Sequence, residues 1–428
     1  MTSAGGAGTT LLAHRLVVAG DVIAAAAMIT DILHEELGLD VADCAINHDG
    51  YSLNSLNGSV TTMDGEHFFF KFHAEEDGDR TAGEWYRAGL LADAGYPIEL
   101  PVRLSTTPGR QVLLYRWRDD ERLADACLRV ERAGAATADD PDLTADARAL
   151  DAQIGRLQVR TMHLASGAEA TAEPIHQLFH HRLVDPDRPN ILGARATRYY
   201  VHRSFELGSA RLDWAMFSTA QWNVNGCLLD DTFVTLLERA HVLLDPGNPA
   251  FRPAVVAHGD AHNANVWRGA DGLVLFDPAF AGAHVPALLA EVKATFHNVW
   301  AHPFWLYHPS ESRTATDARV GDGVLHVVTD WVLTPLRQTL LASKADLVWR
   351  PLLRALRDRG WLDPRWREVV RAALFACPTL VMNLRSGPDG SSRDPRTSLL
   401  GLTIAMLVGS EGSPLDEWFD SIDPGPTA

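Results

Sequence analysis

The segment AVVAHGDAHNANVWRGADGLVLFDP, residues 254–278, constrains the fold more strongly than any other part of the chain. Its two short apolar runs, AVVA and GLVLF, have the length and composition of buried strands. A strand, a turn and a second strand would return the chain on itself. We therefore expect the polar residues between and after these runs, Asp260, Asn265 and Asp277, to lie close together.

These three side chains differ in the chemistry that they offer. Asn265 follows Asp260 by five residues, and Asp277 follows it by seventeen. The oxygens of Asn265 and Asp277 suit Mg²⁺, which prefers hard oxygen ligands and keeps several of its own waters. Asp260 would stay free to accept a proton from a hydroxyl that attacks phosphorus. The alternative is that all three are turn and strand-end residues, where Asp and Asn are common.

The order His258, Asp260, Asn265 has the spacing of the kinase catalytic loop. Gly259 stands where protein kinases usually carry Arg, and Phe-Asp-Pro replaces Asp-Phe-Gly. On these residues the segment resembles the aminoglycoside phosphotransferase and choline kinase-like family of small-molecule kinases. The resemblance implies an ATP- and Mg²⁺-dependent enzyme that phosphorylates an alcohol group, with Asp260 as its catalytic base.

The resemblance also implies an α+β, bilobal protein kinase-like fold. Residues 1–118 would form a strand-rich, nucleotide-binding N-terminal lobe, and residues 119–428 a helical C-terminal lobe for catalysis and substrate binding. In the first lobe the sequence predicts a helix over 11–38, strands around a turn at Asp64-Gly65, a helix over 79–94 and a strand within 109–120. In the second lobe it predicts a surface loop over 134–147 and helices over 148–165, 285–308, 322–345, 349–358, 364–384 and 396–408.

Two upstream residues fit the phosphate-binding part of a kinase. Lys71 lies alone in the apolar run FFFKFH, where a cation could reach the α- and β-phosphates. Glu84 follows on the helix expected over 79–94 and is the natural partner for that cation, although Glu75 and Glu76 compete for this role. An edge-strand charge for Lys71 and a solvated helix face for Glu84 are the alternatives.

Residues 49–60, DGYSLNSLNGSV, form a polar stretch between two expected strands. Small polar residues allow backbone N–H groups to approach phosphate oxygens. The stretch is similar to the short phosphate loops of the same family, and an ordinary hairpin turn explains it equally well. The candidate nucleotide-binding residues are Ser52, Asn54 and Ser55 from this loop, with Tyr115 and Trp117 from the run VLLYRW, where the family's hinge between lobes would meet adenine.

The acceptor site is the least determined part of the prediction. Aromatic faces suit sugar rings and ammonium groups, and several aromatic and polar residues follow the expected metal strand. The candidates are His262, Glu291, Trp300 and Trp305. Core packing is an equal alternative for the tryptophans, because large aromatic side chains dominate protein interiors. A zinc site among the histidines near residue 300 is disfavoured because the sequence has no paired Cys or His-Glu-x-x-His spacing.

Composition narrows the partners and the compartment. The formal net charge of −17 repels nucleic acid and anionic membranes at long range, and would suit a cationic acceptor such as an amino sugar. The four cysteines lack Cys-x-x-Cys spacing and are expected as free thiols of a reducing cytoplasm. The first apolar run, from Leu11, is broken by His14, Arg15 and Asp21, which predicts an amphipathic helix instead of a signal peptide or membrane span. No obligate protein partner is evident.

Together, these features predict a cytoplasmic, ATP-dependent phosphotransferase that acts on an amino sugar, an aminoglycoside-like antibiotic or a related metabolite. A kinase of neutral sugars or other metabolites, or a nucleotide-binding pseudokinase, is the alternative. Protein kinase activity is disfavoured because the chain lacks the Asp-Phe-Gly and Ala-Pro-Glu marks. A metallophosphoesterase is disfavoured because the further His and Asn ligands of a two-metal site are missing.

Overall fold

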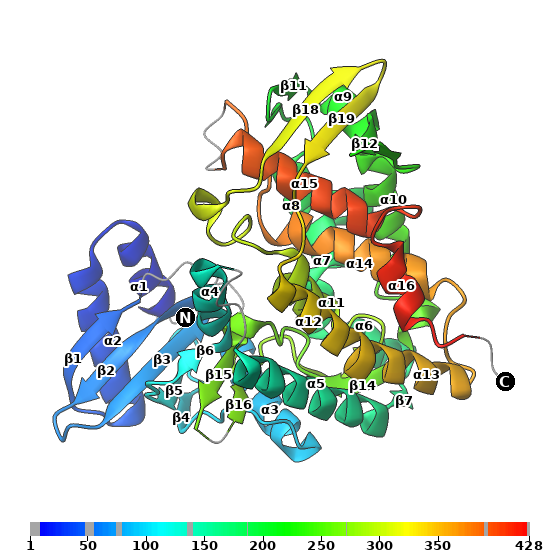
Figure 1. Ribbon diagram of the computed structural model, residues 1–428. Helices are drawn as coiled ribbons and strands as arrows, with labels where there is room; N and C mark the ends of the chain where they lie inside the picture. Colours follow the sequence, from blue (N-terminus) through cyan, green and yellow to red (C-terminus); the bar gives the residue numbers. More distant parts are fainter. Residues whose placement is uncertain are drawn as a thin grey trace. The chain divides into compact units, whose positions relative to one another are not determined.

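The computed structural model describes residues 9–47, 55–73, 79–134, 140–185, 187–270, 272–388 and 393–425. The chain divides into two compact units, one made of Met1–Glu121 with Trp267–Ala279 and the other of Arg122–Val266 with Phe280–Ala428. The first unit is rich in strands and the second is mainly helical (Figure 1). The expected α+β class is therefore confirmed. In the described ranges no helix is both long enough and apolar enough to cross a membrane.

The first unit is built on a five-stranded antiparallel sheet with the order β1-β2-β3-β5-β4. Two helices precede the sheet and one follows its third strand. The elements are α1 (Thr9–Val18), α2 (Val22–Leu37), β1 (Val41–Ile46), β2 (Ser55–Thr62), β3 (His67–His73), α3 (Asp79–Ala94), β4 (Arg103–Ser105) and β5 (Val112–Arg116). The expected strands, the turn at Asp64-Gly65 and the helix over 79–94 are confirmed.

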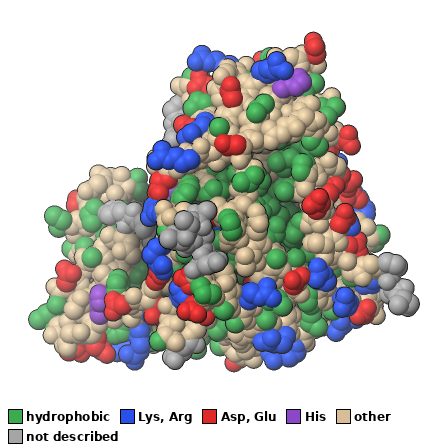
Figure 2. All heavy atoms as spheres, viewed as in Figure 1, with side chains coloured by type: hydrophobic (Ala, Val, Ile, Leu, Met, Phe, Trp, Pro, Cys, Tyr) green, Lys and Arg blue, Asp and Glu red, His purple; other side chains and the backbone are tan. Residues whose placement is uncertain are grey.

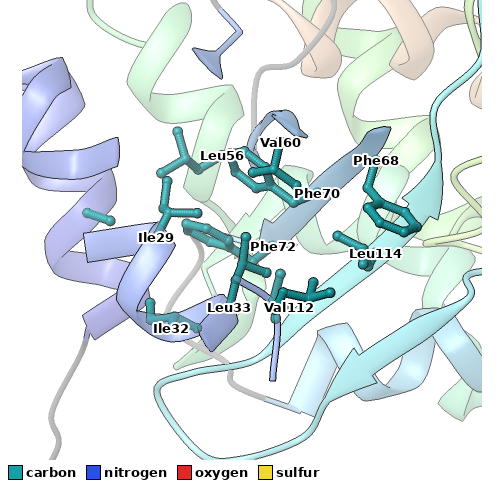
Figure 3. Close-up of a cluster of buried hydrophobic side chains, with 12 residues drawn as sticks. Ile29, Ile32, Leu33, Leu56, Val60, Phe68, Phe70, Phe72, Val112 and Leu114 are labelled. Carbon is teal, nitrogen blue, oxygen red and sulfur yellow. The ribbon is translucent and has the colours of Figure 1, made fainter. Parts of the chain in front are cut away.

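The core of the first unit lies between α2 and one face of this sheet (Figure 3). Alternation along β3 places Phe68, Phe70 and Phe72 on the helix-covered face. Ile29, Ile32 and Leu33 recur at helical spacing along α2 and pack against them. The same alternation turns Lys71 to the opposite face of the sheet, away from α2. An apolar strand can thus carry a lysine without placing its charge in this core.

The predicted single helix over 11–38 is wrong in one respect. The structure has two helices, because Gly20 takes a φ of 85° and Asp21 then caps α2 by accepting a hydrogen bond from the Ala24 N–H at 3.2 Å. A side-chain acceptor at this position satisfies one of the free N–H groups of a helix start. The pair Gly20-Asp21 inside the apolar pattern therefore marks the end of α1 and the start of α2.

The later segment of the first unit, Trp267–Ala279, is made largely of two further strands. They are β15 (Val266–Gly269) and β16 (Gly272–Leu275), which are neighbours in one sheet. Leu275 N–H donates to the Pro97 carbonyl at 2.6 Å, and Glu99 N–H donates to the Leu275 carbonyl at 2.8 Å. These bonds join the segment to the chain that follows α3.

The second unit combines a set of helices with small sheets. Its helices are α4 (Leu123–Ala133), α5 (Pro141–Thr161), α6 (Gly167–Ala172), α7 (His180–Leu183), α8 (Ala194–Tyr199), α9 (Trp214–Thr219), α10 (Phe233–Leu243), α11 (Val292–Thr295), α12 (Pro335–Lys344), α13 (Arg350–Asp358), α14 (Trp366–Val381), α15 (Pro395–Gly409) and α16 (Asp416–Ile422). Its strands include β7 (His163–Leu164), β14 (Pro253–Ala257) and β17 (Gly282–Pro286), which form one sheet with β14 in the middle. Most of the predicted C-terminal helices are confirmed.

Three predictions for the second unit are wrong. Helix α5 begins at Pro141, inside the expected loop over 134–147, because Asp140 caps it through the Leu143 N–H at 2.8 Å and Pro occupies the first turn. The expected helix over 285–308 begins as strand β17 and becomes helical only at α11. The expected helix over 322–345 begins as a strand of the hairpin β18 (Thr316–Gly321) and β19 (Val324–Thr329).

The β18–β19 hairpin has a clear local cause. Its turn is Asp322-Gly323, and both residues have positive φ, 53° and 77°. A two-residue turn of this kind matches the twist of the strands that it joins, and Asp-Gly is a favoured sequence for it. Four strands, β13 (Cys227–Leu228), β12 (Gln221–Val224), β19 and β18, form one sheet in that order.

Candidate functional site

The His-Gly-Asp sequence lies directly after buried strand β14. Gly259 has a φ of 74°, a conformation that side-chain-bearing residues rarely adopt. A Cβ atom there would lie 2.7 Å from the Phe280 carbonyl oxygen and 2.8 Å from a methyl group of Ile175. Glycine is therefore required twice, by conformation and by space. It turns the chain sharply, so that Asp260 leaves the end of a rigid strand in a fixed direction.

The stretch from Asp260 to Asn265 is one tight turn closed by its own hydrogen bonds. His262 N–H donates to the Asp260 carbonyl at 2.8 Å, and Asn265 N–H donates to the His262 carbonyl at 2.7 Å. The side-chain amide nitrogen of Asn265 donates to the Asp260 carbonyl at 3.0 Å. This bond fixes the orientation of the amide group of Asn265, whose oxygen is the atom that can bind a cation.

The carboxylate of Asp260 is buried and has a neighbour on each oxygen. The Nζ of Lys293, from α11, lies 2.5 Å from Oδ2. The Nε2 of His262 lies 3.4 Å from Oδ1. The ammonium group of Lys293 also lies 5.5 Å from the centre of the Phe280 ring. A buried carboxylate with an adjacent ammonium is stabilised in its charged form, which is the form that accepts a proton.

Neighbouring residues hold this turn in place. The side-chain oxygen of Asn298 accepts the Asn263 N–H at 2.7 Å, and Arg337 donates to the Asn298 carbonyl at 2.8 Å. The ring of His297 lies 5.5 Å from that of His262 and is hydrogen-bonded to the Tyr307 hydroxyl. Burial lowers the pKa of His297 well below its usual range, and His262 and Lys293 lower it further. This histidine is therefore neutral.

In the first unit, Lys71 and Asp277 form an ion pair. Lys71 lies on β3, and Asp277 follows β16 with a φ of 57°, an unusual value for a residue other than glycine. Strained backbone of this kind persists only where the surrounding structure enforces it, and it is concentrated at functional sites. Glu84 lies in α3, as the sequence predicts, but its side chain is outside the described part of the structure. Its pairing with Lys71 stays a prediction.

The predicted nucleotide-binding residues are placed as follows. Ser52 and Asn54 lie outside the described residues, and Ser55 is the first residue of β2. Tyr115 is buried on β5, where it pairs with Phe69 of β3. Trp117 follows β5 and is partly exposed. Its ring stacks on His67 at 4.3 Å, and its indole N–H donates to Asp119 at 2.8 Å.

The predicted acceptor residues fall into two groups. His262 lies beside Asp260. Trp300 and Trp305 have no exposed surface, and the indole N–H of Trp305 donates to the Trp300 carbonyl at 2.8 Å. Glu291 is also buried, with Lys344 2.7 Å from one oxygen and Gln158 2.8 Å from the other. The positions of Glu291 and the two tryptophans therefore favour packing over contact with an acceptor.

The two predicted metal ligands belong to different units, Asn265 to the second and Asp277 to the first. Across the described ranges, no group of three or more His, Cys, Asp or Glu side chains is arranged to hold a metal ion. The histidines near residue 300 therefore form no such cluster among the residues that the structure describes.

The sequence prediction missed Lys293. The sequence does contain a signal for this residue. Lys293 is a lone lysine in the apolar run VPALLAEVKATF, just as Lys71 is in FFFKFH, and the same reasoning would have identified both. The pairing of Lys71 with Asp277 was also missed, since the two residues are far apart in sequence and lie on different predicted strands.

No family model and no curated protein matches the sequence. Solved structures do show similarity, and those named here are small-molecule kinases or phosphotransferases. An amicoumacin kinase in complex with AMP-PNP, Ca²⁺ and Ami is 11% identical, with 88% of this chain and 92% of that chain covered and a TM-score of 0.43. A Plasmodium vivax ethanolamine kinase is 10% identical, with 89% and 83% covered and a TM-score of 0.39. An aminoglycoside phosphotransferase of Streptomyces rimosus is 12% identical, with 89% and 97% covered and a TM-score of 0.33. At these values the similarity carries no functional assignment, which depends on the residues themselves.

Proposed function

We propose that this chain is an ATP-dependent phosphotransferase that phosphorylates a hydroxyl group of a small molecule. The observation that carries the proposal is the buried Asp260 carboxylate, held at the end of β14 by a glycine-dependent turn that also fixes Asn265. A base and a metal-ligand oxygen are thereby set five residues apart on one rigid turn. Phosphoryl transfer requires little more of the protein than such positioning and electrostatic stabilisation.

In the proposed reaction, Asp260 accepts the proton of the acceptor hydroxyl. The acceptor oxygen forms a bond to the γ-phosphorus as the bond from that phosphorus to the bridging oxygen of ADP breaks. The proton of the acceptor hydroxyl passes to the Asp260 carboxylate, which is later reset by loss of the proton to solvent. Burial of Asp260 removes competing water and keeps the base aligned.

The residues proposed for the nucleotide and the metal are suited to them. Asp277 offers carboxylate oxygens and Asn265 an amide oxygen, and both are ligands that Mg²⁺ prefers. Lys71 carries the charge that phosphate oxygens require, and Glu84 is the proposed second partner of that lysine. When bound, Mg²⁺ would neutralise phosphate charge. Lys71 and Asp277 form an ion pair with each other. When Mg·ATP is bound, a negatively charged phosphate would replace Asp277 as the partner of Lys71, and the positively charged metal would replace Lys71 as the partner of Asp277.

For the acceptor, we propose an amino sugar or an aminoglycoside-like molecule first and a neutral sugar second. The overall negative charge supports a cationic acceptor through steering. The support is modest, because acidic and basic side chains are interspersed on the visible face (Figure 2). Because Trp300 and Trp305 are buried, they do not support an acceptor site lined by aromatic side chains.

The decisive experiment is ADP release from Mg·ATP by the purified chain across a panel of acceptors, including glucosamine, kanamycin and glucose. The Asp260→Asn variant supplies the blank for contaminating activity. Acceptor-dependent release above that blank supports the proposal, and a preference for glucose would replace the cationic acceptor with a neutral one. Tight nucleotide binding without turnover on any acceptor would favour a pseudokinase instead.

A further inference from the structure

A close ion pair that the sequence motif does not contain joins Lys293 to Asp260. We propose that Lys293 is a positioning residue of the transfer reaction, which holds the base through one oxygen and leaves the other to the acceptor hydroxyl. This inference rests on the proposed function. It adds a residue that the motif does not contain, since Lys293 lies on a separate element, α11, 33 positions beyond Asp260.

The pair is costly to build, so its retention requires a reason. Both side chains are almost entirely buried, and transferring two charges from water to a protein interior is often not fully repaid by their attraction. Apolar residues of similar size would serve packing equally well. A lysine kept in the run VPALLAEVKATF is therefore explained better by the carboxylate that it contacts than by the core around it.

The geometry indicates what Lys293 does for Asp260. A carboxylate can rotate about its terminal bond, and this torsion has broad minima. The contact of 2.5 Å between Nζ and Oδ2 fixes that rotation. The other oxygen, Oδ1, then faces His262, whose Nε2 lies 3.4 Å from it. The hydroxyl would approach Oδ1, and a fixed carboxylate plane gives it a single direction of approach.

The same unit contains a matched control. Lys344 is also a buried lysine, with its Nζ 2.7 Å from Glu291 and 2.9 Å from Asp151, but neither carboxylate belongs to the catalytic turn. The two lysines therefore share burial and pairing and differ in which carboxylate they hold. If burial and pairing alone mattered, Lys293→Met and Lys344→Met would have the same consequences.

The test compares Lys293→Met, Lys293→Arg and Lys344→Met with the wild type, using Mg·ATP and the acceptor of the panel that turns over fastest. We expect Lys293→Met to lower kcat about 10- to 100-fold, the loss typical of a misplaced catalytic group. KM for Mg·ATP should be nearly unchanged, and Lys293→Arg should recover part of kcat. Lys344→Met should lower the unfolding temperature while the folded enzyme keeps its kcat.

A second measurement covers the case in which Lys293→Met does not fold. Lys293→Ala leaves space for a small cation, and added propylammonium should restore part of its turnover. The same treatment of folded Lys344→Ala, which should already have the kcat of the wild type, should not change its turnover. Unchanged kcat in folded Lys293→Met, or failure of rescue in folded Lys293→Ala, would overturn the inference about Lys293 and leave the proposed function standing. Absence of wild-type turnover on every acceptor would overturn the proposed function, and the inference with it.

Discussion

Among the described residues of the second unit, two buried lysine–carboxylate sites differ in their surroundings. Lys344 lies at the end of α12, between Asp151 of α5 and Glu291, which are themselves bound by Ser343 at 2.6 Å and Gln158 at 2.8 Å. Burial by itself lowers the pKa of Lys344, but the charges of Asp151 and Glu291 outweigh this effect and raise it. Each carboxylate oxygen of Asp151 and Glu291 has a partner, as is typical of a structural network.

The site at Lys293 is organised around a loop instead of between helices. Its carboxylate, Asp260, follows a glycine in a left-handed conformation, and the neighbour of its second oxygen is a histidine. Burial and pairing are common to both sites, so they do not identify the site that we propose to serve chemistry. We propose that the element that carries the carboxylate does, and the following predictions test that distinction.

The largest expected effect separates the two carboxylates. Asp260→Asn keeps the shape of the side chain and removes the proton acceptor, so turnover should fall by roughly 10²–10⁴ while nucleotide binding is kept. Asp151→Asn, the matched change at Lys344, should lower the free energy of unfolding by about 3 kcal/mol and leave turnover of the folded enzyme intact. Steady-state kinetics and urea denaturation of both variants check this. Normal turnover by Asp260→Asn would exclude it as the base.

The second prediction concerns Trp305, whose fully buried side chain favours a structural role. Trp305→Ala should lower the free energy of unfolding by about 3–5 kcal/mol, because it removes a fully buried aromatic side chain. The acceptor KM of the surviving folded enzyme should not change. Val332→Ala, at a side chain that is 71% exposed, is the surface control. A raised acceptor KM with little loss of stability would return Trp305 to the acceptor site.

The third prediction extends the comparison to buried groups that are kept neutral. Burial lowers the pKa of both His176 and His180 to about 4, in a cluster with His181, His241 and Asp245. Between about pH 6.5 and 4 the unfolded chain binds protons that the folded chain does not. The free energy of unfolding should therefore fall by about 1–3 kcal/mol as the pH drops through this window.

Chemical denaturation at pH 7 and pH 5 measures this loss. His176→Gln keeps a donor for the Ala170 carbonyl, which the His176 ring contacts at 2.8 Å, and should reduce the pH dependence. His34→Gln, at an exposed histidine of the first unit, should leave it unchanged. Equal slopes in all three proteins would show that the buried histidines do not govern acid stability.

The smallest expected effect concerns the lysine–carboxylate pair of the first unit. Asp277→Ala should weaken binding of Mg·ATP by roughly tenfold, or about 1.4 kcal/mol, because a proposed metal ligand is lost. Binding of ATP without Mg²⁺ should change less, and calorimetry in the two conditions gives the difference. Equal losses in both titrations would make Asp277 a structural strand end, with no role in binding the metal.

Local patterns predicted the elements that position the site. The apolar run FFFKFH and the turn at Asp64-Gly65 predict β3, and the apolar runs on either side of residues 260–265 predict β14 and β16. The tight turn from Asp260 to Asn265 is closed by local hydrogen bonds, and this part of its form is accessible to sequence reasoning. The bond from the Asn263 N–H to Asn298 comes from tertiary structure and is not.

The missed features had two causes. The Asp322-Gly323 turn and the Asp140 cap are local signals that the helical pattern around them concealed. The contacts of Lys293 with Asp260 and of Lys71 with Asp277 depend on tertiary structure, which brings together residues from distant elements. Sequence spacing can identify a lysine as unusual, but it cannot name the carboxylate that the lysine meets.

The division of the chain has a consequence for its synthesis. The first unit takes Trp267–Ala279 from a late part of the chain, after Arg122–Val266 of the second unit. Synthesis from the N-terminus therefore produces about half of the second unit before the first can be completed. Nascent chains would lack β16 and most of β15 for that whole interval, and incomplete domains of this kind are prone to aggregation. Fragments that end near residue 121 should share this defect, so neither half can be produced by a single cut.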